Sequence, residues 1–418
     1  MELNVNLWYY NIDLEIGGVK MKILSVNCGS SSLKFQAYEM PEEKVLISGY
    51  FEKIGLDDSF YTLKFNGEKI KKVVSVKDHA VAAQLLIDEL LENNIVTDLS
   101  EIKGVGHRIV HGGDKYADSV IINDEVIKTV EELSPLAPLH NPANLIGVRA
   151  MMKAIPGAVH TAVFDTAFHQ TMPKENFIYS VPYSWYRDYK IRKYGFHGTS
   201  HKYITNVMQE KLGMKDVNII CCHVGSGGSL TAVKGGKSFD TTMGFGPNAG
   251  ITMGTRCGDI DYATIFYAMK KTGMSVDEID NVLNKKSGLL GISEKFSDSR
   301  DIEDGMNNGD ELCTLANTIY IQKVVNYIAE YYVKLDGKVD AIVFTAGTGE
   351  NAREIRKTIV DKLNCLGIYL DRDMNSKIAS YLDIKEGIIS TPESRVPVYV
   401  IPTDEEVVIA RDAFNFVK

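Results

Sequence analysis

The chain of 418 residues has little cysteine, only two tryptophans and no long apolar run. Its six cysteines form no CxxC pair, which argues against a zinc ribbon or a thioredoxin-like site. No apolar stretch approaches the roughly 18 residues that span a bilayer, so no membrane partner is expected. With a net charge of −9, the chain lacks the overall basic charge typical of nucleic-acid-binding proteins, although an acidic protein can still carry a local anion site. These absences favour a reduced, cytoplasmic location and no nucleic-acid partner.

The remaining composition is that of an ordinary globular protein, with 44% hydrophobic and 24% charged residues. At roughly 150 residues per domain, the length predicts two or three domains. Residues 1–20 differ in pattern from the rest, and the sequence changes abruptly at Met21. We interpret 1–20 as a non-native or disordered extension, which an intact native mass beginning at Glu2 would contradict. The alternative is a short arm that packs Trp8 and Tyr9 on the body.

Two stretches share one pattern of strand, Gly/Ser turn and strand. The first contains the apolar runs 22–27 and 33–38, which flank the turn at 29–32. The second, 217–233, overlays on it with one extra residue in its turn. This similarity predicts a diverged internal duplication. Without a Pro/Gly/Ser linker, the two halves are expected to pack together.

The other elements follow from hydrophobic periodicity and from capping signals. Expected strands are 104–111, 158–165, 339–345 and 397–401, and expected helices are 79–93, 199–213, 259–272, 275–285 and 310–335. Thr199 or Ser200 is the expected N-cap of the 199–213 helix.

Three Gly-rich turns each follow a strand, at 29–32, 225–229 and 347–351. Glycine lets backbone N–H groups approach phosphate oxygens, and serine hydroxyls add donors. One such turn is weak evidence, because hairpins also use Gly and Ser. Three in one chain favour a nucleotide held between two halves. None fits GxxxxGK[ST] or the dinucleotide-binding G-x-G-x-x-G.

Charged and imidazole side chains also gather at strand ends and loops, namely Arg108, Asp165, His197 and Arg256. Taken singly, an arginine near a Gly turn more often forms a surface or structural ion pair than part of an active site. An aspartate after a strand is often a helix cap. Together they are the set that phosphoryl transfer needs: cations for the spreading charge, a carboxylate and a hydrogen-bond donor.

At this point the chain from Met21 to about Phe416 resembles the acetate kinase family, in the superfamily of acetate and sugar kinases, heat-shock chaperones and actin. The matching blocks are NCGSSSLKF (27–35), GHRIVHGG (106–113), LAPLHNPAN (136–144), VFDTAFH (163–169), YGFHGTSH (194–201), MGTRCGDID (253–261), FTAGTGEN (344–351) and PTDEE (402–406).

The resemblance implies an α/β, two-domain actin-like ATPase (ribonuclease H-like) fold, in which a duplicated mixed sheet is flanked by helices. One domain would contain 21–168 and 402–418. The other, 169–401, would hold the nucleotide site and the interface of a homodimer. The implied reaction is direct in-line phosphoryl transfer between ATP and acetate, giving acetyl phosphate and ADP with Mg²⁺ or Mn²⁺.

The family's functional residues carry over to matching positions. Arg108 and Arg256 would grip the carboxylate and the phosphoryl group, His197 would stabilise the transition state, His140 would support it, and Asp165 would orient the acceptor. Asn27 and Glu405 would bind the metal. The acetate methyl would enter a pocket of Val110, Leu139, Phe196 and Pro247. The nucleotide would contact Ser30, Ser32, Lys34, His223, Gly225, Ser226, Gly227, Asp298, Ser299, Arg300, Gly347, Thr348, Gly349 and Asn351.

Four positions depart from the family pattern, and three of them lie on the nucleotide side or beside the cleft. Ser226 replaces an asparagine, Ala249 a glutamate, and Thr348 and Ser299 replace apolar residues. The acyl-side residues are intact. We therefore expect a weaker or altered nucleotide preference.

The sequence leaves alternative functions open. A propionate or other short-chain acyl kinase would differ only in pocket volume, and a variant could use another phosphoryl donor such as pyrophosphate. A catalytically silent nucleotide-binding switch is a different class, which turnover would exclude. A sugar kinase is disfavoured because two arginines suit an anionic acceptor.

Overall fold

The computed structural model describes residues 19–418, so the interpretation of 1–20 concerns residues almost wholly outside the described part. The described chain separates into two compact units. One contains the described residues through His107 together with Ile146–Thr161 and Ile409–Lys418, and the other contains Arg108–Leu145 and Ala162–Val408. No helix in the described residues is long and apolar enough to cross a membrane.

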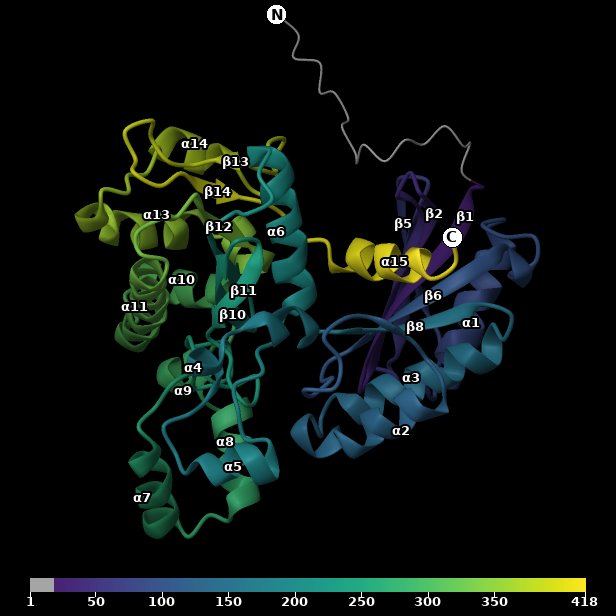
Figure 1. Cartoon of the computed structure of the whole chain (residues 1–418), viewed down its shortest axis with the longest axis horizontal. Coiled ribbons are helices and arrows are strands. Elements are labelled where there is room, and N and C mark those ends of the chain that lie inside the picture. The colour runs from purple at the N-terminus through teal and green to yellow at the C-terminus, as the bar shows by residue number, and fades with distance from the viewer. Residues whose placement is uncertain (1–18) are drawn as a thin grey trace, which may run out of the picture. The chain divides into compact units, whose positions relative to one another are not determined.

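Two mixed sheets organise the fold (Figure 1). The eight-stranded sheet has the order β5-β4-β3-β2-β1-β6-β8-β7, and the six-stranded sheet has the order β11-β10-β9-β12-β14-β13. Their strands are β1 Met21–Gly29, β2 Ser32–Met40, β3 Lys44–Glu52, β4 Phe60–Phe65, β5 Glu68–Val73, β6 Ile102–Ile109, β7 Val120–Ile121, β8 Val159–Phe164, β9 Ile219–Val224, β10 Gly228–Lys234, β11 Lys237–Thr241, β12 Ala341–Thr345, β13 Gly387–Ile388 and β14 Val398–Val400.

The expected duplication is present in the strand pairing. β1 pairs antiparallel with β2 and parallel with β6, and β9 pairs antiparallel with β10 and parallel with β12 in the same way. The first hairpin closes at the Gly29–Ser32 pair and the second at the Val224–Gly228 pair, so the second turn is one residue longer. The expectation of a duplicated mixed sheet is confirmed.

Helices flank both sheets. The α-helices are α1 His79–Glu92, α2 Asp124–Glu132, α3 Asn141–Ala154, α4 Lys174–Phe177, α5 Tyr183–Tyr189, α6 Gly198–Leu212, α7 Tyr262–Thr272, α8 Val276–Lys285, α9 Gly288–Ser293, α10 Ser299–Asn307, α11 Glu311–Lys334, α12 Ala346–Asn351, α13 Arg353–Lys362, α14 Arg372–Lys377 and α15 Glu405–Asn415. Short 3₁₀ turns occur at Leu99–Glu101, Ser134–Leu136, Ala167–Thr171 and Asn364–Leu366.

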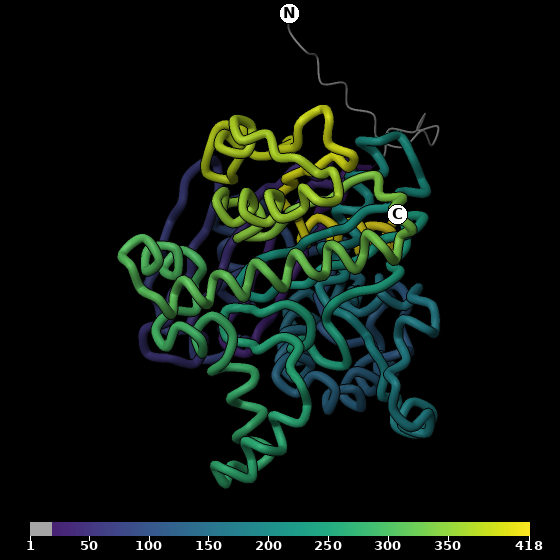
Figure 2. The backbone as a smooth tube through the Cα atoms, turned by 90° about the vertical axis from the view of Figure 1, so that its left-hand side faces the viewer, coloured from purple at the N-terminus to yellow at the C-terminus, as the bar shows by residue number. Residues whose placement is uncertain are grey.

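The six-stranded sheet is buried on both faces. Alternate residues of β9 face opposite layers: Ile220 and Cys222 belong to the apolar cluster of α11, whereas Ile219 and Cys221 pack with α6. α11 runs across the sheet as one long helix (Figure 2). Because each face has its own helix, the strands carry nearly continuous apolar runs.

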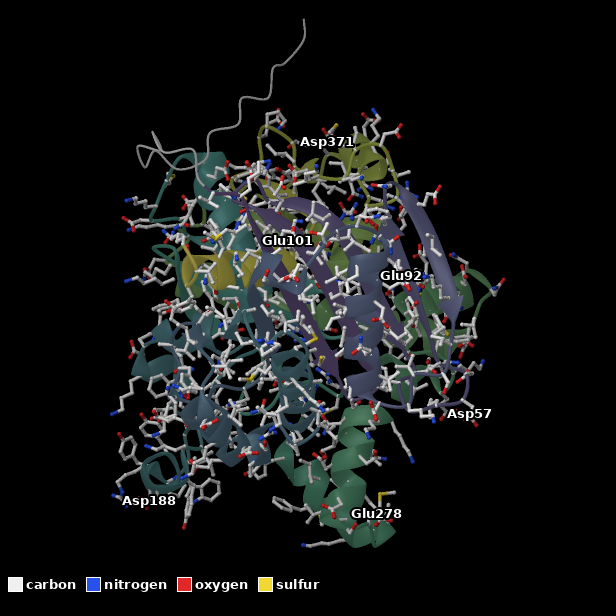
Figure 3. All side chains as sticks on the ribbon, turned by 90° about the vertical axis from the view of Figure 1, so that its right-hand side faces the viewer. Asp57, Glu92, Glu101, Asp188, Glu278 and Asp371 are labelled. Carbon is white, nitrogen blue, oxygen red and sulfur yellow. The ribbon has the colours of Figure 1, made fainter. Side chains whose placement is uncertain are left out.

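α7 and α8 project from the rest of their unit (Figure 2). α7 has no buried residue, and α8 buries only Ile279. Glu278, near the tip of the projection, is labelled in Figure 3 and completes a capping box with Ser275. These helices therefore contribute little to the core of the chain.

Two local expectations are wrong. The N-cap of α6 is His197, with φ 56° and ψ 26°, and Thr199 and Ser200 lie inside the helix. The Gly-rich stretch 347–351 is not an open turn, because it forms most of the short helix α12. In both places a strained residue, His197 or Ala346 (φ 65°), lets the chain turn abruptly into a helix.

Candidate active site

An arginine–aspartate pair joins the ends of two strands. Arg108, the second-to-last residue of β6, donates from Nε to both carboxylate oxygens of Asp165, at 2.9 and 3.1 Å, and from Nη2 to Oδ2 at 2.5 Å. Asp165 directly follows β8 and is 1% exposed. Burial alone would lower the pKa of Arg108, but the charge and hydrogen bonds of Asp165 raise it above its ordinary value. The bidentate geometry is the strong form of this ion pair.

His197 and Arg256 meet at the turn between β9 and β10. A β-carbon added at Gly227 would lie 3.6 Å from Arg256 Nη1 and 3.7 Å from His197 Nε2. The His197 ring stacks on His223, with ring centroids 4.2 Å apart. The lack of a side chain at Gly227 therefore leaves the space in front of these two groups open.

Arg256 has only neutral partners in the described chain. Its Nη1 donates to the carbonyl of Pro247 at 3.0 Å and contacts Met253 Sδ at 3.8 Å. Burial lowers its pKa from the ordinary value. A partly buried guanidinium without a carboxylate is a suitable partner for an anionic ligand.

The histidines of this region are kept neutral. The pKa of His197 lies well below its ordinary value because of burial, His223 and His201, and then Arg108 and Arg256. Burial also lowers the pKa of His140, helped by Arg108 and Arg256. The structure thus brings Arg108, Asp165, His140, His197 and Arg256 into one electrostatic neighbourhood.

Oxygen donors lie beside Arg108. Glu405 Oε2 is 4.0 Å from Arg108 Nε, and Thr199 Oγ1 donates to the same oxygen at 3.4 Å. Carboxylate and hydroxyl oxygens are the ligands that hard divalent cations prefer, so this donor set fits such an ion. Among the described residues no cluster of three or more His, Cys, Asp and Glu forms a complete metal site. Asn27 lies on β1, in the other unit.

Only some of the residues expected to form the acyl pocket are buried together. Val110 and Phe196 are 5% and 2% exposed and belong to one apolar cluster. Pro247 is tied to Arg256 by its carbonyl. Leu139, at 56% exposed, is open to solvent.

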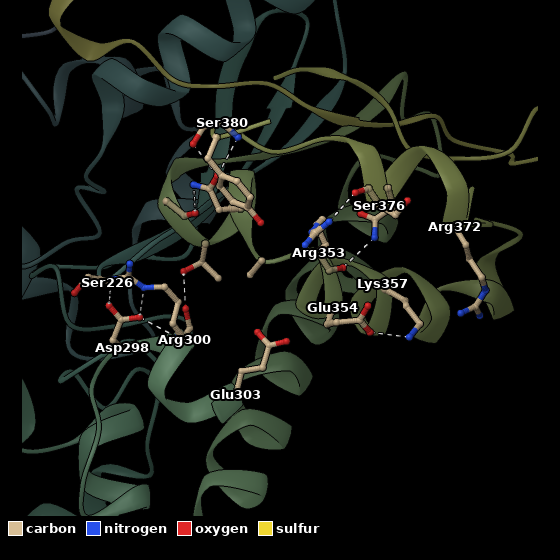
Figure 4. A pocket seen from close by; sticks show the side chains of 17 residues that line it. Ser226, Asp298, Arg300, Glu303, Arg353, Glu354, Lys357, Arg372, Ser376 and Ser380 are labelled. Atoms are coloured by element: carbon tan, nitrogen blue, oxygen red, sulfur yellow. Dashed lines mark hydrogen bonds and ion pairs between the residues drawn. The ribbon is translucent and has the colours of Figure 1, made fainter. Parts of the chain in front are cut away.

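Half of the nucleotide residues expected from the sequence line one cavity of about 930 Å³ (Figure 4). Seven of them line it, namely Ser226, Asp298, Ser299, Arg300, Gly347, Thr348 and Asn351. The hydroxyls of Ser299 and Thr348 lie 3.3 Å apart. Figure 4 places Ser226 at one end of the cavity and Arg372 at the other.

Other expected nucleotide residues do not line this cavity. His223 is in β9, and Gly225 and Gly227 form part of the β9–β10 turn. Gly349 is in α12, where its carbonyl accepts from Arg356 Nη1 at 3.0 Å. Ser30, Ser32 and Lys34 belong to the β1–β2 hairpin of the other unit.

A buried arginine that the sequence analysis missed supports the cavity wall. Arg356 is 0% exposed, and its five donor contacts are all to neutral oxygens, namely Asn375 Oδ1, Gly349 O, Glu350 O, Asn375 O and Ile378 O. Burial lowers its pKa to about 10. The signal was available in α13, where Arg356 lies among Ile355, Ile359 and Val360 on the buried face.

Comparison with known proteins identifies first the fold class of this chain and then its family. The strand order and helical layers are those of an actin-like ATPase fold. The Acetokinase family model matches residues 22–411. The acetate kinase of Bacillus cytotoxicus is 52% identical over 393 residues, which are 94% of this chain and 98% of that protein.

Two solved structures share the fold over almost their whole length. Porphyromonas gingivalis acetate kinase is 43% identical, covers 95% of this chain and 100% of its own, and has a TM-score of 0.88. A propionate kinase from Francisella tularensis is 40% identical, covers 94% and 99%, and has a TM-score of 0.89.

The chain belongs to the acetokinase family. It is therefore a phosphotransferase whose phosphoryl acceptor is a carboxyl group, as the sequence led us to expect. The family implies ATP or ADP as co-substrate and a divalent metal.

Arg356 provides a test of how the cavity wall is held. We expect Arg356→Lys to lower the free energy of unfolding by about 3 kcal/mol, because an ammonium cannot reach all five acceptors. The KM for ATP should rise as the Gly349–Glu350 segment loosens. Urea unfolding and steady-state kinetics measure the two effects. Arg187→Lys, at an exposed pair with Asp188, is the control, and equal stability of both variants would contradict the prediction.

Proposed function

We propose that the chain catalyses reversible, metal-dependent transfer of the γ-phosphoryl group of ATP directly to acetate, giving acetyl phosphate and ADP. The observation that carries this proposal is Arg256, a partly buried cation with only neutral partners in the described chain, beside His197 at the Gly227 turn. Ser226, which precedes Gly227 in this turn, lines the cavity described above.

The chemical difficulty is repulsion between two anions. A carboxylate is already ionised at neutral pH, so its oxygen needs no strong base before it attacks phosphorus. The two arginines reduce this repulsion. Arg256 pairs with the anionic ligands, and Arg108 adds positive potential. Arg108 cannot swing freely, because Asp165 holds it in a bidentate pair. Fixed cations of this kind stabilise the charge that develops in transfer without reorganising.

His197, His140 and Asp165 orient the reacting groups. His197 donates a hydrogen bond to the transferring phosphoryl group, and His140 supports the site from beside both arginines. Asp165 fixes Arg108 and through it the acceptor. Because His197 is neutral at physiological pH, it provides a donor and no further charge.

The metal would be held by Glu405, with Thr199 and Asp165 nearby, and Mg²⁺ or Mn²⁺ suits these oxygen ligands. Asn27 as a further ligand stays a prediction. When bound, such an ion neutralises part of the phosphate charge.

The adenosine would occupy the cavity between α10 and α12. Asp298 and Arg300 form a bidentate pair at its rim, and Asn351 is anchored to Ser380. Ser299 and Thr348 place two hydroxyls against this space. Roles for Ser30, Ser32 and Lys34 along the phosphates stay predictions.

Acetate is the acceptor that we favour, and propionate is the alternative. Val110 and Phe196 are packed in the core, so the methyl site is confined on that side. One methylene changes discrimination by about 1–3 kcal/mol, so substrate comparison must decide.

We expect the purified chain to form acyl phosphate from Mg-ATP and acetate, and Arg256→Ala to lower kcat/KM by about 10²–10³-fold, as for loss of one transition-state donor. Hydroxylamine trapping measures the product. Acetate, propionate and butyrate are compared, with pyrophosphate as alternative phosphoryl partner.

Arg187→Ala, which removes an exposed cation paired with Asp188, is the matched control and should keep full activity. Turnover of propionate above acetate would favour the alternative acceptor. No turnover with any pair, while nucleotide still binds, would replace the enzyme by a nucleotide-binding switch.

Ser226 generates a separate prediction about the donor. Its side chain lines the cavity, and its carbonyl accepts from Gly254 N at 3.0 Å. An asparagine amide there would add a donor toward the phosphates. We expect Ser226→Asn to lower the KM for ATP about threefold to tenfold, the value of one hydrogen bond. An ordinary KM for ATP in the parent chain, unchanged in the variant, would refute the idea.

We further propose a homodimer. Tyr262, Phe266 and Tyr267 of α7 are 73%, 58% and 64% exposed, an aromatic face that a second copy would cover. Sedimentation at twice 46.4 kDa is expected, and Phe266→Glu should give monomers. A parent chain that sediments as a monomer would reject the proposal. The division into 21–168 with 402–418 and 169–401, and the cytoplasmic location, stay predictions.

A further inference from the structure

Two histidines share one serine hydroxyl behind the proposed active site. Ser229 is the second residue of β10 and is 0% exposed. Its Oγ lies 2.8 Å from His197 Nδ1 and 2.8 Å from His201 Nε2. His197 is the N-cap of α6 and His201 lies one turn later, so both rings reach the same strand.

The hydroxyl has a single hydrogen, so it can donate to only one of the two imidazoles. Toward the other it must accept. The described chain offers Ser229 Oγ no third partner, so the two histidines are coupled: the nitrogen that receives the hydroxyl hydrogen must be bare, and the other must carry a proton.

The surroundings of His201 Nδ1 decide which of the two imidazoles receives the hydroxyl hydrogen of Ser229. His201 is 0% exposed, and its Nδ1 has no hydrogen-bond partner in the described chain. A proton on Nδ1 would leave a buried N–H without an acceptor, which native structures rarely tolerate. The His201 proton therefore belongs on Nε2, where it donates to Ser229. Ser229 then donates to His197 Nδ1, and the proton of His197 is left on Nε2.

The Nε2 atom of His197 is on the side of the ring where we propose that the phosphoryl group is transferred. It lies toward the Gly227 turn, where Arg256 Nη1 also lies. A neutral imidazole donates from one nitrogen only. With the proton on Nδ1 instead, His197 would present a lone pair to the oxygens of the phosphoryl group and would repel them.

We propose that Ser229, backed by His201, is a positioning residue that holds His197 as the neutral Nε2–H tautomer, so that it donates to the phosphoryl group during transfer. The proposal rests on the proposed function for the identity of the acceptor. Ser229 does not touch the reacting atoms and acts only through His197.

The first test reads the tautomer in the wild-type protein and needs no variant of Ser229. Nitrogen-15 NMR of histidine-labelled protein distinguishes protonated from bare ring nitrogens, and His197→Gln assigns the His197 signals by their loss. We expect Nε2 protonated and Nδ1 bare at neutral pH. Nδ1 protonated in the wild type would overturn the proposal.

The second test uses Ser229→Ala with a matched control. We expect kcat about tenfold lower, the equivalent of one lost hydrogen bond, KM values for ATP and acetate within about twofold of the parent, and a mixture of His197 tautomers. Ser229→Thr, which keeps the hydroxyl, should recover most of kcat. Ser238→Ala removes the corresponding 2.8 Å bond to His169 Nδ1 and should leave kcat unchanged.

The outcomes separate the two proposals. Full kcat in Ser229→Ala, or an equal loss in Ser238→Ala, would overturn the role of Ser229 while acyl phosphate formation by the parent still supports the proposed function. A parent chain without turnover would defeat the proposed function, and the NMR tautomer would still decide whether Ser229 sets the state of His197.

Discussion

The ion pair between Arg108 and Asp165 is the interaction on which the site depends. Asp165 also acts through its backbone: its N–H donates to Ile109 O and its carbonyl accepts from Gly198 N. One residue thus joins the end of β6, the end of β8 and the start of α6. The approach is so close that a β-carbon at Gly198 would lie 2.0 Å from Asp165 O. His197 takes its left-handed conformation at this junction, so the residue that fixes Arg108 through its carboxylate also holds the start of the His197 helix through its backbone.

Charge and direction are assigned to different side chains in this site. Burial lowers the pKa of His169 and of His223 to about 4, and the pKa of His197 also falls. Positive charge therefore comes from arginines, whose geometry is set by Asp165 or by neutral carbonyls. The neutral histidines contribute oriented donors and acceptors. With this division the charge of the site stays constant over the physiological pH range, because His169, His197 and His223 do not need to gain or lose a proton.

Sequence patterns predicted the parts of this fold that depend on local periodicity. The strands around both Gly/Ser turns and the extra residue of the second turn were found, because apolar alternation and turn residues lie next to each other in the chain. The N-cap of α6 was missed, because the preference for a hydroxyl at Thr199 or Ser200 was overridden by the contact of Gly198 with Asp165. The role of Ser229 was also missed, since it depends on His197 and His201, which lie 32 and 28 residues away in sequence. Arg356 was missed although its place on the buried face of α13 could have been read from the pattern, because three of its five acceptors belong to Asn375 and Ile378, 19 and 22 residues away.

The duplicated hairpins show where such long-range roles can arise. In each sheet the apolar faces of the strands carry the packing, so the turn residues are free to differ. In the first copy, His79 Nε2 contacts Gly29 O at 2.7 Å and braces a two-residue turn. In the second copy the added residue opens the turn at Gly227, and the next inward position on β10 is Ser229. The same hairpin thus provides open space in front of His197, at Gly227, and a hydroxyl behind it, at Ser229. A hairpin that only had to close the sheet would require neither.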